Sequence, residues 1–434
     1  MINNIGKDAS EFFAFIKRII KLSPKYGFGL YPAFIHLCYV LSHLMPRRRN
    51  LWVLACWDGL VFNDNTKHLF LHIHNNHQDI TPVWLSRSRD IVKKLRAHGY
   101  RAYYSFSLQG IYHELRAGYI FLDHTLDFAN IWFTGGASRI NLWHGSPLKV
   151  ILYDQKDSIL NKPWWQKNIY RFAIPESFVN PKYVTAPSDA FVNVFSSAFK
   201  LPKERVIVTG YPRNDAIFHN AKGYDILDNS TYDQLDNIRH DNPKAQSVLY
   251  LPTFRKGQVW RKKVFIDELS DGELRIEGLE LAELSRFLQD NNSFFIIKAH
   301  YLAGLQVRHF MRRGRILFLP VGFDVYPILR LTDILVTDFS SIYFDFLLTG
   351  KPIIFYNYDL ERYVNERSLY FDYQSATPGP KAANFEELLY WLKKIIAGED
   401  EYAAQRQILE KIAFDDSDDN SAERIYKFVK GLIK

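Results

Sequence analysis

The sequence predicts an α/β protein with two mainly parallel sheets that face each other across a cleft. Short apolar runs alternate with longer amphipathic runs, the alternation occurs in two series, and a polar stretch separates the series. Alternation of this kind predicts parallel strands joined by helices. The apolar runs are nearly continuous, which is typical of parallel strands that are buried on both faces.

The first series begins at LWVLAC. Its predicted strands cover residues 51–56, 79–86, 100–105, 118–123, 139–145, 182–188 and 205–210. Asp64 or Asn65 can begin a helix over 64–76, Gly99 ends a second helix that starts at 90, and a third starts at Asp189. We expect this domain to cover residues 51–218.

The second series begins at SVLYLPTF. Its predicted strands cover residues 247–254, 293–300, 315–320, 332–338 and 351–356, with a helix around 279–288. We expect this domain at 246–410 and a C-terminal helix at 411–434. The Asn- and Asp-rich stretch at 219–245 is typical of a linker.

Composition favours an enzyme or binding protein with anionic partners. The chain has 434 residues, a net charge of +8 and a pI near 9.1. Such a charge favours nucleotides, phosphopolymers or anionic lipid headgroups. No nucleic-acid recognition module is visible, so nucleic acid is not an expected partner. The two cysteines, Cys38 and Cys56, cannot form a disulfide framework, and a reducing cytoplasm is the default compartment.

The first 50 residues form an unusual segment. No charged residue lies between Tyr26 and Pro46, and basic clusters flank this stretch at 17–21 and 47–49. The pattern is compatible with a helix that lies on anionic lipid, with a helix buried in the fold, and with a membrane span. We expect a hydrophobic, membrane-associating helical segment at 1–50.

Polar residues gather where the predicted strands end, which is where open α/β sheets bind ligands. The first cluster includes His144, which can take a proton from an attacking hydroxyl at neutral pH. Gly145 lets the backbone approach a ligand closely, and Pro147 fixes the turn. The alternative is a histidine that only caps a turn.

Three further clusters supply cations. Arg213 can bind phosphate in a bidentate manner, or it can form an inter-domain salt bridge with Asp215 or another acid. Thr253 and Arg255 follow a predicted strand that Pro252 terminates rigidly. Lys298 and His300 end another strand, and two cationic or proton-carrying groups at one strand end suit a phosphate.

The fifth cluster is DFSSIYFD at 338–345. Ser340 and Ser341 begin a helix, where free backbone N–H groups and the positive end of the helix dipole favour an anion. Asp345 lies one helical turn further and can accept a bond from a ligand hydroxyl. The alternative for the serines is plain N-capping.

No motif for a phosphate-binding P-loop, a dinucleotide fold or a serine hydrolase is present. His72, His74 and His77 could suggest a metal cluster. They lie on a predicted helix at spacings that do not share one face, so the sequence favours a solvated helix there and no metal site.

The combined motifs are more specific than any one of them. They read WHGSPLK at 143–149, GYPRND at 210–215, PTFR at 252–255 and DFSSIYFD at 338–345, with WDGLVFNDNTKHLF at 57–70, KP at 351–352 and YDLERY at 358–363. This set resembles the family of CDP-glycerol glycerophosphotransferases, which includes teichoic acid primases and polymerases and related capsule polymerases. One motif departs from the family pattern Arg-x-His-Pro, because this chain has Lys298, Ala299, His300 and Tyr301.

The resemblance implies a GT-B architecture of two Rossmann-like domains, with the acceptor on the first and the CDP-activated donor mainly on the second. It implies transfer of glycerol phosphate or a similar polyol phosphate to a lipid-linked or polymeric acceptor, at the cytoplasmic face of the membrane. His144 is the expected base, and His300 the expected proton donor to the leaving phosphate. No cofactor or metal is expected. The expected donor-binding residues are Trp143, Gly145, Ser146, Pro147, Arg213, Pro252, Thr253, Arg255, Lys298, Ser340, Ser341 and Asp345.

Two alternatives stay open. The first is a GT-B glycosyltransferase that uses a sugar nucleotide, which would have the same fold and release UDP instead of CMP. The second is a basic lipid- or polymer-binding protein without turnover, in which replacing His144 would change nothing.

Overall fold

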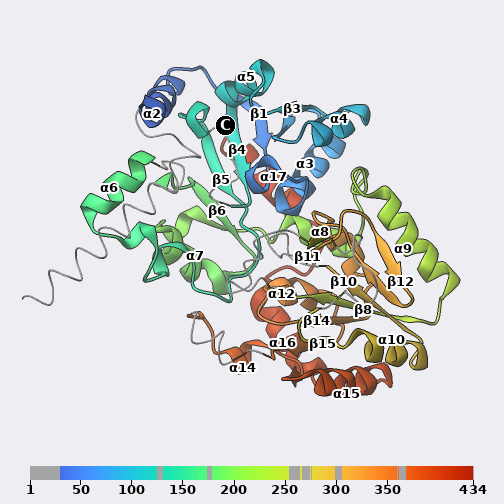
Figure 1. Cartoon of the computed structure of the whole chain (residues 1–434). Coiled ribbons are helices and arrows are strands. Elements are labelled where there is room, and N and C mark those ends of the chain that lie inside the picture. Colours follow the sequence, from blue (N-terminus) through green and yellow to red (C-terminus); the bar gives the residue numbers. More distant parts are fainter. Residues whose placement is uncertain are drawn as a thin grey trace, which may run out of the picture.

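Two seven-stranded sheets form the framework of the protein (Figure 1). The structure is a computed structural model that describes residues 30–124, 131–173, 178–253, 264–265, 274, 276–298, 305–358, 360 and 368–433. The predicted α/β class with parallel sheets is confirmed.

The first sheet is parallel throughout, in the order β3-β2-β1-β4-β5-β6-β7. Its strands are β1 Arg48–Leu54, β2 Thr81–Ser86, β3 Ala102–Tyr104, β4 Ala117–Leu122, β5 Ser138–Asn141, β6 Tyr183–Ala186 and β7 Val206–Val208. Trp52 and Leu54 of β1 pack into one core cluster, and Leu51 and Val53 pack into another. Both faces are therefore buried, as the apolar runs predict.

The second sheet has the order β12-β13-β10-β8-β14-β15-β16, and only the edge pair β12–β13 is antiparallel. Its strands are β8 Gln246–Leu251, β10 Ser293–Ile297, β12 Met311–Arg313, β13 Ile316–Phe318, β14 Ile334–Thr337, β15 Ile353–Tyr356 and β16 Lys381–Ala382. A separate pair joins β9 Val264–Phe265 to β11 Leu305–Gln306. The strand order reverses between β1 and β4 in the first sheet and between β8 and β14 in the second, which marks the expected ligand position.

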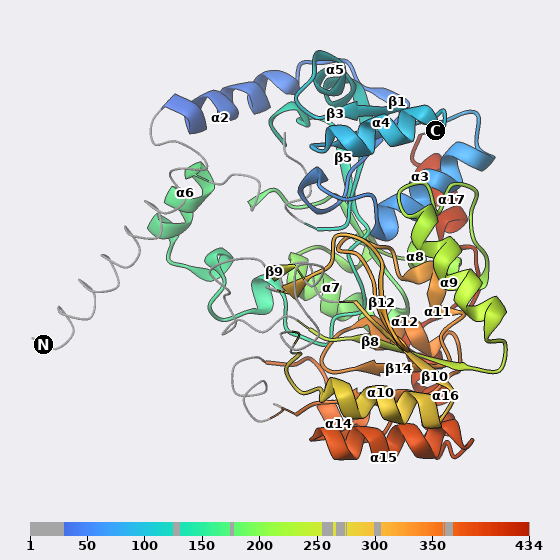
Figure 2. The same ribbon diagram turned by 45° about the vertical axis from the view of Figure 1, so that its right-hand side comes forward.

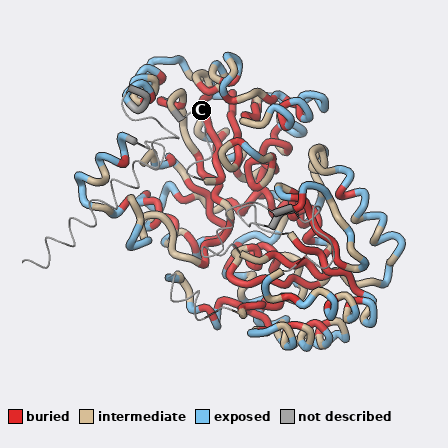
Figure 3. The backbone as a smooth tube through the Cα atoms, viewed as in Figure 1, coloured by how far each residue is buried: buried red, intermediate tan, exposed pale blue. Residues whose placement is uncertain are grey.

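Helices cover the sheets, and Figure 3 shows their outer faces exposed around buried strands. In the first half they are α3 Asp64–Asn76, α4 Arg89–Ala97, α5 Leu108–Arg116, α6 Trp164–Ala173, α7 Val192–Phe199 and α8 Pro212–Phe218. In the second they are α10 Leu281–Asp290, α11 Tyr326–Leu329, α12 Ile342–Leu347, α14 Tyr373–Ala376, α15 Phe385–Ile396 and α16 Ala403–Ala413. Helix α9, Asn229–Asp241, lies within the stretch predicted as a linker, and its Tyr232 is buried in the core.

The last helix, α17 Ser421–Gly431, returns to the first half (Figures 1 and 2). Its apolar side chains Ala422, Ile425 and Val429 belong to the core cluster that contains Trp52. The Asp215 carboxylate on α8 accepts hydrogen bonds from the backbone N–H groups of Ser421 and Ala422, at 3.0 and 2.9 Å. The N-terminus of α17 is thus capped by a residue of the first half.

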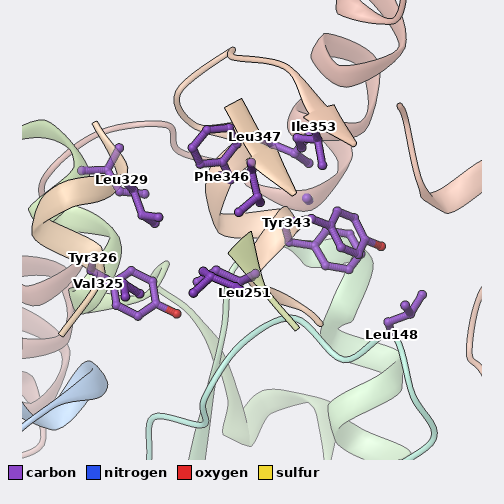
Figure 4. Packing of buried hydrophobic residues seen from close by; sticks show 14 of the residues in the cluster. Leu148, Leu251, Val325, Tyr326, Leu329, Tyr343, Phe346, Leu347 and Ile353 are labelled. Atoms are coloured by element: carbon purple, nitrogen blue, oxygen red, sulfur yellow. The ribbon is translucent and has the colours of Figure 1, made fainter. Parts of the chain in front are cut away.

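The two halves share one core cluster, part of which is shown in Figure 4. Leu148 from the first half and Leu251, Tyr326 and Tyr343 from the second belong to it. Two backbone hydrogen bonds add to this contact: Val150 N–H donates to the Ser368 carbonyl and Tyr370 N–H to the Leu148 carbonyl, at 3.0 and 2.9 Å. The two halves are therefore packed directly against each other.

Only part of the predicted hydrophobic segment at 1–50 can be described, because residues 1–29 lie outside the described residues. Helix α2, Leu30–Ser42, precedes β1. Among the described helices, none has the length and apolar content to cross a membrane. The 47–49 cluster is used within the fold: Arg47 donates to the carbonyls of Ser42 and Glu114, both at 2.6 Å. Arg47 thereby links the end of α2 to α5.

Candidate active site

A cavity of about 660 Å³ lies where the strands of both sheets end. Polar lining groups come from both halves, because the loops after β1, β4 and β5 meet the loops after β8, β10 and β14. Among the predicted site residues, it is lined by Trp143, His144, Gly145, Ser146, Pro147, Arg213, Pro252, Thr253, Lys298, Ser340 and Ser341. Asp345 is buried next to Arg213, while Arg255 and His300 lie outside the described residues.

His144 has a defined tautomer. Its Nδ1 lies 2.9 Å from the carbonyl oxygen of Asp123, and a carbonyl only accepts, so Nδ1 carries the proton. Nε2 is then the ring nitrogen with a lone pair. Burial lowers the pKa of His144, and this keeps the imidazole neutral near pH 7. The side chain is therefore prepared to accept a proton.

Aromatic rings surround His144. The ring centroids of Trp143, Trp57 and His124 lie 4.2, 5.4 and 5.3 Å from the His144 ring. Burial lowers the pKa of His124 to about 3, so this neighbour is neutral as well. Such surroundings limit the access of water to the base and help to fix its ring orientation.

Strained backbone accompanies the site. Of the seven non-glycine residues with positive φ in the described part of the chain, four line the cavity: Trp57, Asp58, Asp64 and Trp143. Trp143 has φ +57°, and its neighbours hold it there: its N–H donates to Asn141 Oδ1 at 2.8 Å, and its carbonyl accepts from Asn65 Nδ2 at 2.7 Å. Strain that surrounding contacts maintain is typical of functional sites.

Gly145, which follows β5, lies tightly against Arg213 and against Ser341 of the second half. Its φ is +124°, and a Cβ atom at this position would lie 2.7 Å from Arg213 Nη2 and 2.9 Å from Ser341 Oγ. In the structure the close neighbours of Gly145 are protein groups, one from each half, and its predicted close approach to a ligand stays a prediction. Glycine is required on both conformational and steric grounds.

Arg213 joins the two halves beneath the cavity. Nη1 donates to Asp64 Oδ1 at 2.7 Å and Nη2 to Asp345 Oδ2 at 2.6 Å. Burial alone would lower the pKa of Arg213, but the adjacent carboxylates raise it well above its usual value. The geometry is thus that of an inter-domain salt bridge, made with acids other than Asp215. The phosphate-binding role predicted for Arg213 stays a prediction, as does the hydroxyl-binding role of Asp345.

A second buried ionic group lies at the same junction. Asp324 Oδ2 accepts from Lys67 Nζ at 2.8 Å and contacts His68 Nε2 at 2.9 Å. Burial would raise the pKa of Asp324, yet the Lys67 ammonium and the contact with His68 hold it well below its usual range. These contacts fix α3 against the second half.

On the second half, Asp338 at the end of β14 holds the neighbouring loop. Its carboxylate accepts from Thr253 N–H at 3.0 Å, from Thr253 Oγ1 at 2.9 Å and from Phe339 N–H at 2.6 Å. Ser341 precedes α12 and makes no side-chain capping hydrogen bond. Lys298 lines the cavity nearby, and burial lowers its pKa. Two serine side chains and an ammonium group thus line one wall opposite His144.

Sequence reasoning missed several residues that position this site. Asp64, Asn65, Asp123 and Asp324 are buried and hold loops from different elements together. Asp64 and Asn65 belong to the 57–70 motif, but their partners lie far away in the sequence. Nothing in the local pattern around Asp324 marks it.

A second hollow of about 380 Å³ lies between α9 and the second sheet. Gln246, Ser247 and Ile334 line it, and these residues begin β8 and β14. Ligands of open α/β sheets bind at the opposite strand ends, so we place the substrates in the larger cavity.

The fold and the cavity define an α/β protein with its candidate site between two mainly parallel sheets. The family model for CDP-Glycerol:Poly(glycerophosphate) glycerophosphotransferase matches residues 37–431. The chain belongs to this family, as its motifs predict.

Curated relatives agree with this assignment. The chain is 26% identical over 396 residues to the teichoic acid glycerol-phosphate transferase of Staphylococcus aureus, covering 90% of this chain and 96% of the relative. It is 25% identical over 384 residues to the teichoic acid poly(glycerol phosphate) polymerase of Bacillus subtilis, covering 88% of this chain. It spans only 48% of that polymerase, about half its length. It is also 23% identical over 407 residues to the teichoic acid ribitol-phosphate primase of Bacillus spizizenii, covering 91% and 94%.

The solved structure of the wall teichoic acid polymerase TagF has the same fold. Its TM-score is 0.69 at 19% sequence identity, over 97% of this chain and 98% of that chain.

Proposed function

We propose that this chain transfers a polyol phosphate, with glycerol phosphate as the leading candidate, from a CDP-activated donor to a hydroxyl of a lipid-linked or polymeric acceptor. The observation that carries the proposal is His144, whose Nδ1–H is fixed on the Asp123 carbonyl and whose neutral Nε2 can accept a proton. This base lines the same cavity as Lys298, Ser340 and Ser341.

In the proposed step, the acceptor oxygen attacks the phosphorus that bears the polyol. A new P–O bond forms, the P–O bond to CMP breaks, and His144 Nε2 takes the acceptor proton. Negative charge accumulates on the leaving CMP, so fixed positive and hydrogen-bonding groups lower the barrier. Lys298, Ser340, Ser341 and Thr253 would supply such groups, and His300 would protonate the leaving phosphate. The proposal requires no cofactor and no tightly bound metal.

The proposed architecture is GT-B-like, with the acceptor on the first half and the donor on the second. The position of His144 after β5, facing loops after β8 and β14, supports this division. Teichoic acid and capsule-type polymers both contain acceptors of the proposed chemistry. The names of the relatives favour the teichoic acid pathway.

The proposed location is the cytoplasmic face of the membrane. Exposed apolar side chains on α2 and just after it include Phe34, Leu37, Val40, Leu41 and Leu44, the last at 79% exposure. Helix α6 lies next to α2 (Figure 2). It adds Trp164, at 74% exposure, and Phe172, whose ring stacks on His36 with centroids 5.5 Å apart. An apolar and aromatic surface of this kind suits the membrane interface and would place the enzyme beside a lipid-linked acceptor. Replacing Leu37, Leu41 and Leu44 with Ser should release the protein from vesicles while activity on a short soluble acceptor persists.

The decisive experiment is mass spectrometry of the products formed from CDP-glycerol, CDP-ribitol and UDP-sugars with a defined lipid-linked acceptor. We expect CMP release and an acceptor mass increased by one polyol phosphate. UDP release with a sugar adduct would favour the glycosyltransferase alternative. Binding without any turnover, unchanged in His144→Ala, would favour the non-catalytic alternative.

A further inference from the structure

Two histidines and one glutamate converge where α17 meets α3, away from the cavity. His72 Nε2 lies 3.0 Å and His77 Nε2 lies 2.8 Å from the same oxygen, Glu423 Oε2. The three atoms all lie within 4.8 Å of one another. His72 and His77 would not share a helical face if the helix continued. His77, however, is the first residue after α3, and its backbone N–H donates to the Ile73 carbonyl.

The chemistry of this cluster matches a transition-metal site. Imidazole nitrogens and a carboxylate oxygen are the ligands that Zn²⁺ takes, with bonds of about 2.0–2.2 Å in a tetrahedral arrangement. That geometry separates ligand atoms by roughly 3.4 Å, so the two distances from Glu423 Oε2 to the histidine nitrogens need to open by only about half an ångström. The side chains are partly exposed, which leaves room for ion entry and for a water as fourth ligand.

Neighbouring contacts already orient the ligands. Lys427 Nζ lies 3.5 Å from Glu423 Oε1, which leaves Oε2 directed at the histidines. The ring of Tyr426 stacks on His77 with centroids 3.5 Å apart. Metal binding would move the proton of His72 to Nδ1 and lose only a weak 3.4 Å contact from Asn76.

We propose that His72, His77 and Glu423 form a binding site for a divalent transition-metal ion, with Zn²⁺ as the best match, that fastens the C-terminal helix α17 to α3. This site is independent of the proposed transfer reaction. His72 lies about 12 Å along the helix axis from Asp64, whose carboxylate binds Arg213 at the cavity. The ion would thus stabilise the C-terminal end of α3, the helix whose N-terminal end carries Asp64 at the cavity.

The rival explanation is a purely hydrogen-bonded triad, in which both Nε2–H groups donate to Glu423. Metal titration separates the two. The full-length chain without an affinity tag is stripped with EDTA, dialysed and titrated with Zn²⁺ against a chromophoric chelator. We expect about one ion per chain and a rise in melting temperature on adding Zn²⁺. With Co²⁺, we expect visible absorption bands typical of a low-coordinate nitrogen and oxygen site.

The variants His77→Gln and Glu423→Gln should each weaken Zn²⁺ binding at least tenfold and abolish the thermal shift. His74→Gln is the matched control, because His74 is exposed on the same helix and lies outside the cluster. Melting of the metal-free variants shows whether they fold. Zn²⁺ binding that is absent in the wild type, or equal in the wild type and both cluster variants, would overturn the proposal.

Discussion

The guanidinium of Arg213 on α8 donates to the carboxylate of Asp345 on α12, with Nη2 and Oδ2 2.6 Å apart. Both side chains are buried, and the contact crosses from one sheet-bearing half to the other. The other terminal nitrogen, Nη1, donates to Asp64 on α3. Arg213 therefore links α3, α8 and α12 at the cavity. Its geometry links the stability of the interface to the relative position of the two walls of the cavity.

Arg213→Met should destabilise the protein strongly. It leaves the buried carboxylates of Asp64 and Asp345 without their cation, and breaking a buried ion pair this way costs about 3–5 kcal/mol. Chemical denaturation would measure the loss of unfolding free energy. Arg286→Met, at an exposed position on α10, is the control and should change little. A loss in Arg213→Met as small as in the control would show that the pair contributes little.

His144→Ala should reduce turnover by roughly a hundred- to ten-thousandfold, because a general base contributes this much. Binding of CDP-glycerol, measured by calorimetry, should stay nearly unchanged. His98→Ala, at the exposed end of α4, serves as the control. Near-wild-type turnover in His144→Ala would remove this residue from the chemistry.

The acid limb of the pH profile should lie below pH 6.5. Burial lowers the pKa of His144, so the neutral, active form persists as pH falls and is lost only when pH passes the lowered value. Measurements of kcat/KM from pH 5 to 8 would locate this limb. An inflection above pH 6.5, or one that survives in His144→Ala, contradicts the assignment of His144 as the base.

Gly145→Ala should impair both folding and transfer. The new methyl group would meet Arg213 Nη2 at 2.7 Å and Ser341 Oγ at 2.9 Å, on a backbone with φ +124°. Gly398→Ala is a matched control: φ is +89° there, but no atom lies within 4 Å of the position that the new methyl group would take. The control should show only the backbone cost of about 1 kcal/mol or more. Equal losses of activity in both variants would mean that the close approach at Gly145 is unimportant.

Ser340→Ala combined with Ser341→Ala should weaken CDP-glycerol binding about tenfold or more, because hydrogen bonds to charged groups are worth about 1.5–3 kcal/mol. Stability should change little, since Ser341 makes no capping bond. Ser88→Ala provides the contrast, because Ser88 Oγ does cap α4 by accepting from Ile91 N–H. If the double variant melts earlier and binds the donor normally, the serines serve the fold alone.

The sequence is informative where function follows from position along a strand. His144, Ser340 and Ser341 can be placed at strand ends because apolar runs mark the strands, and the cavity gathers those ends. The ion pairs between the two halves could not be predicted from the sequence. Asp64, Arg213 and Asp345 are far apart in the chain, and the sequence does not show which acidic residue pairs with Arg213.

Two other misses have a similar origin. Helical spacing predicts that His72 and His77 lie on different faces. In the structure they lie together with Glu423, because α3 ends at Asn76 and Glu423 is supplied by a helix that is distant in the sequence. The stretch at 219–245 is as polar as a linker, yet α9 buries Tyr232, with Leu235 and Ile238 packed against the core. Tertiary contacts decide in both cases.

The return of α17 to the first half has a consequence for biosynthesis. On the ribosome, the first sheet emerges hundreds of residues before Ala422, Ile425 and Val429, which complete its core. Domains usually fold as they emerge. Here the part translated first must wait, with an apolar groove open and Asp215 without the helix that it caps, until the second half has been made. The core of the first half is therefore completed only after the second half has been synthesised.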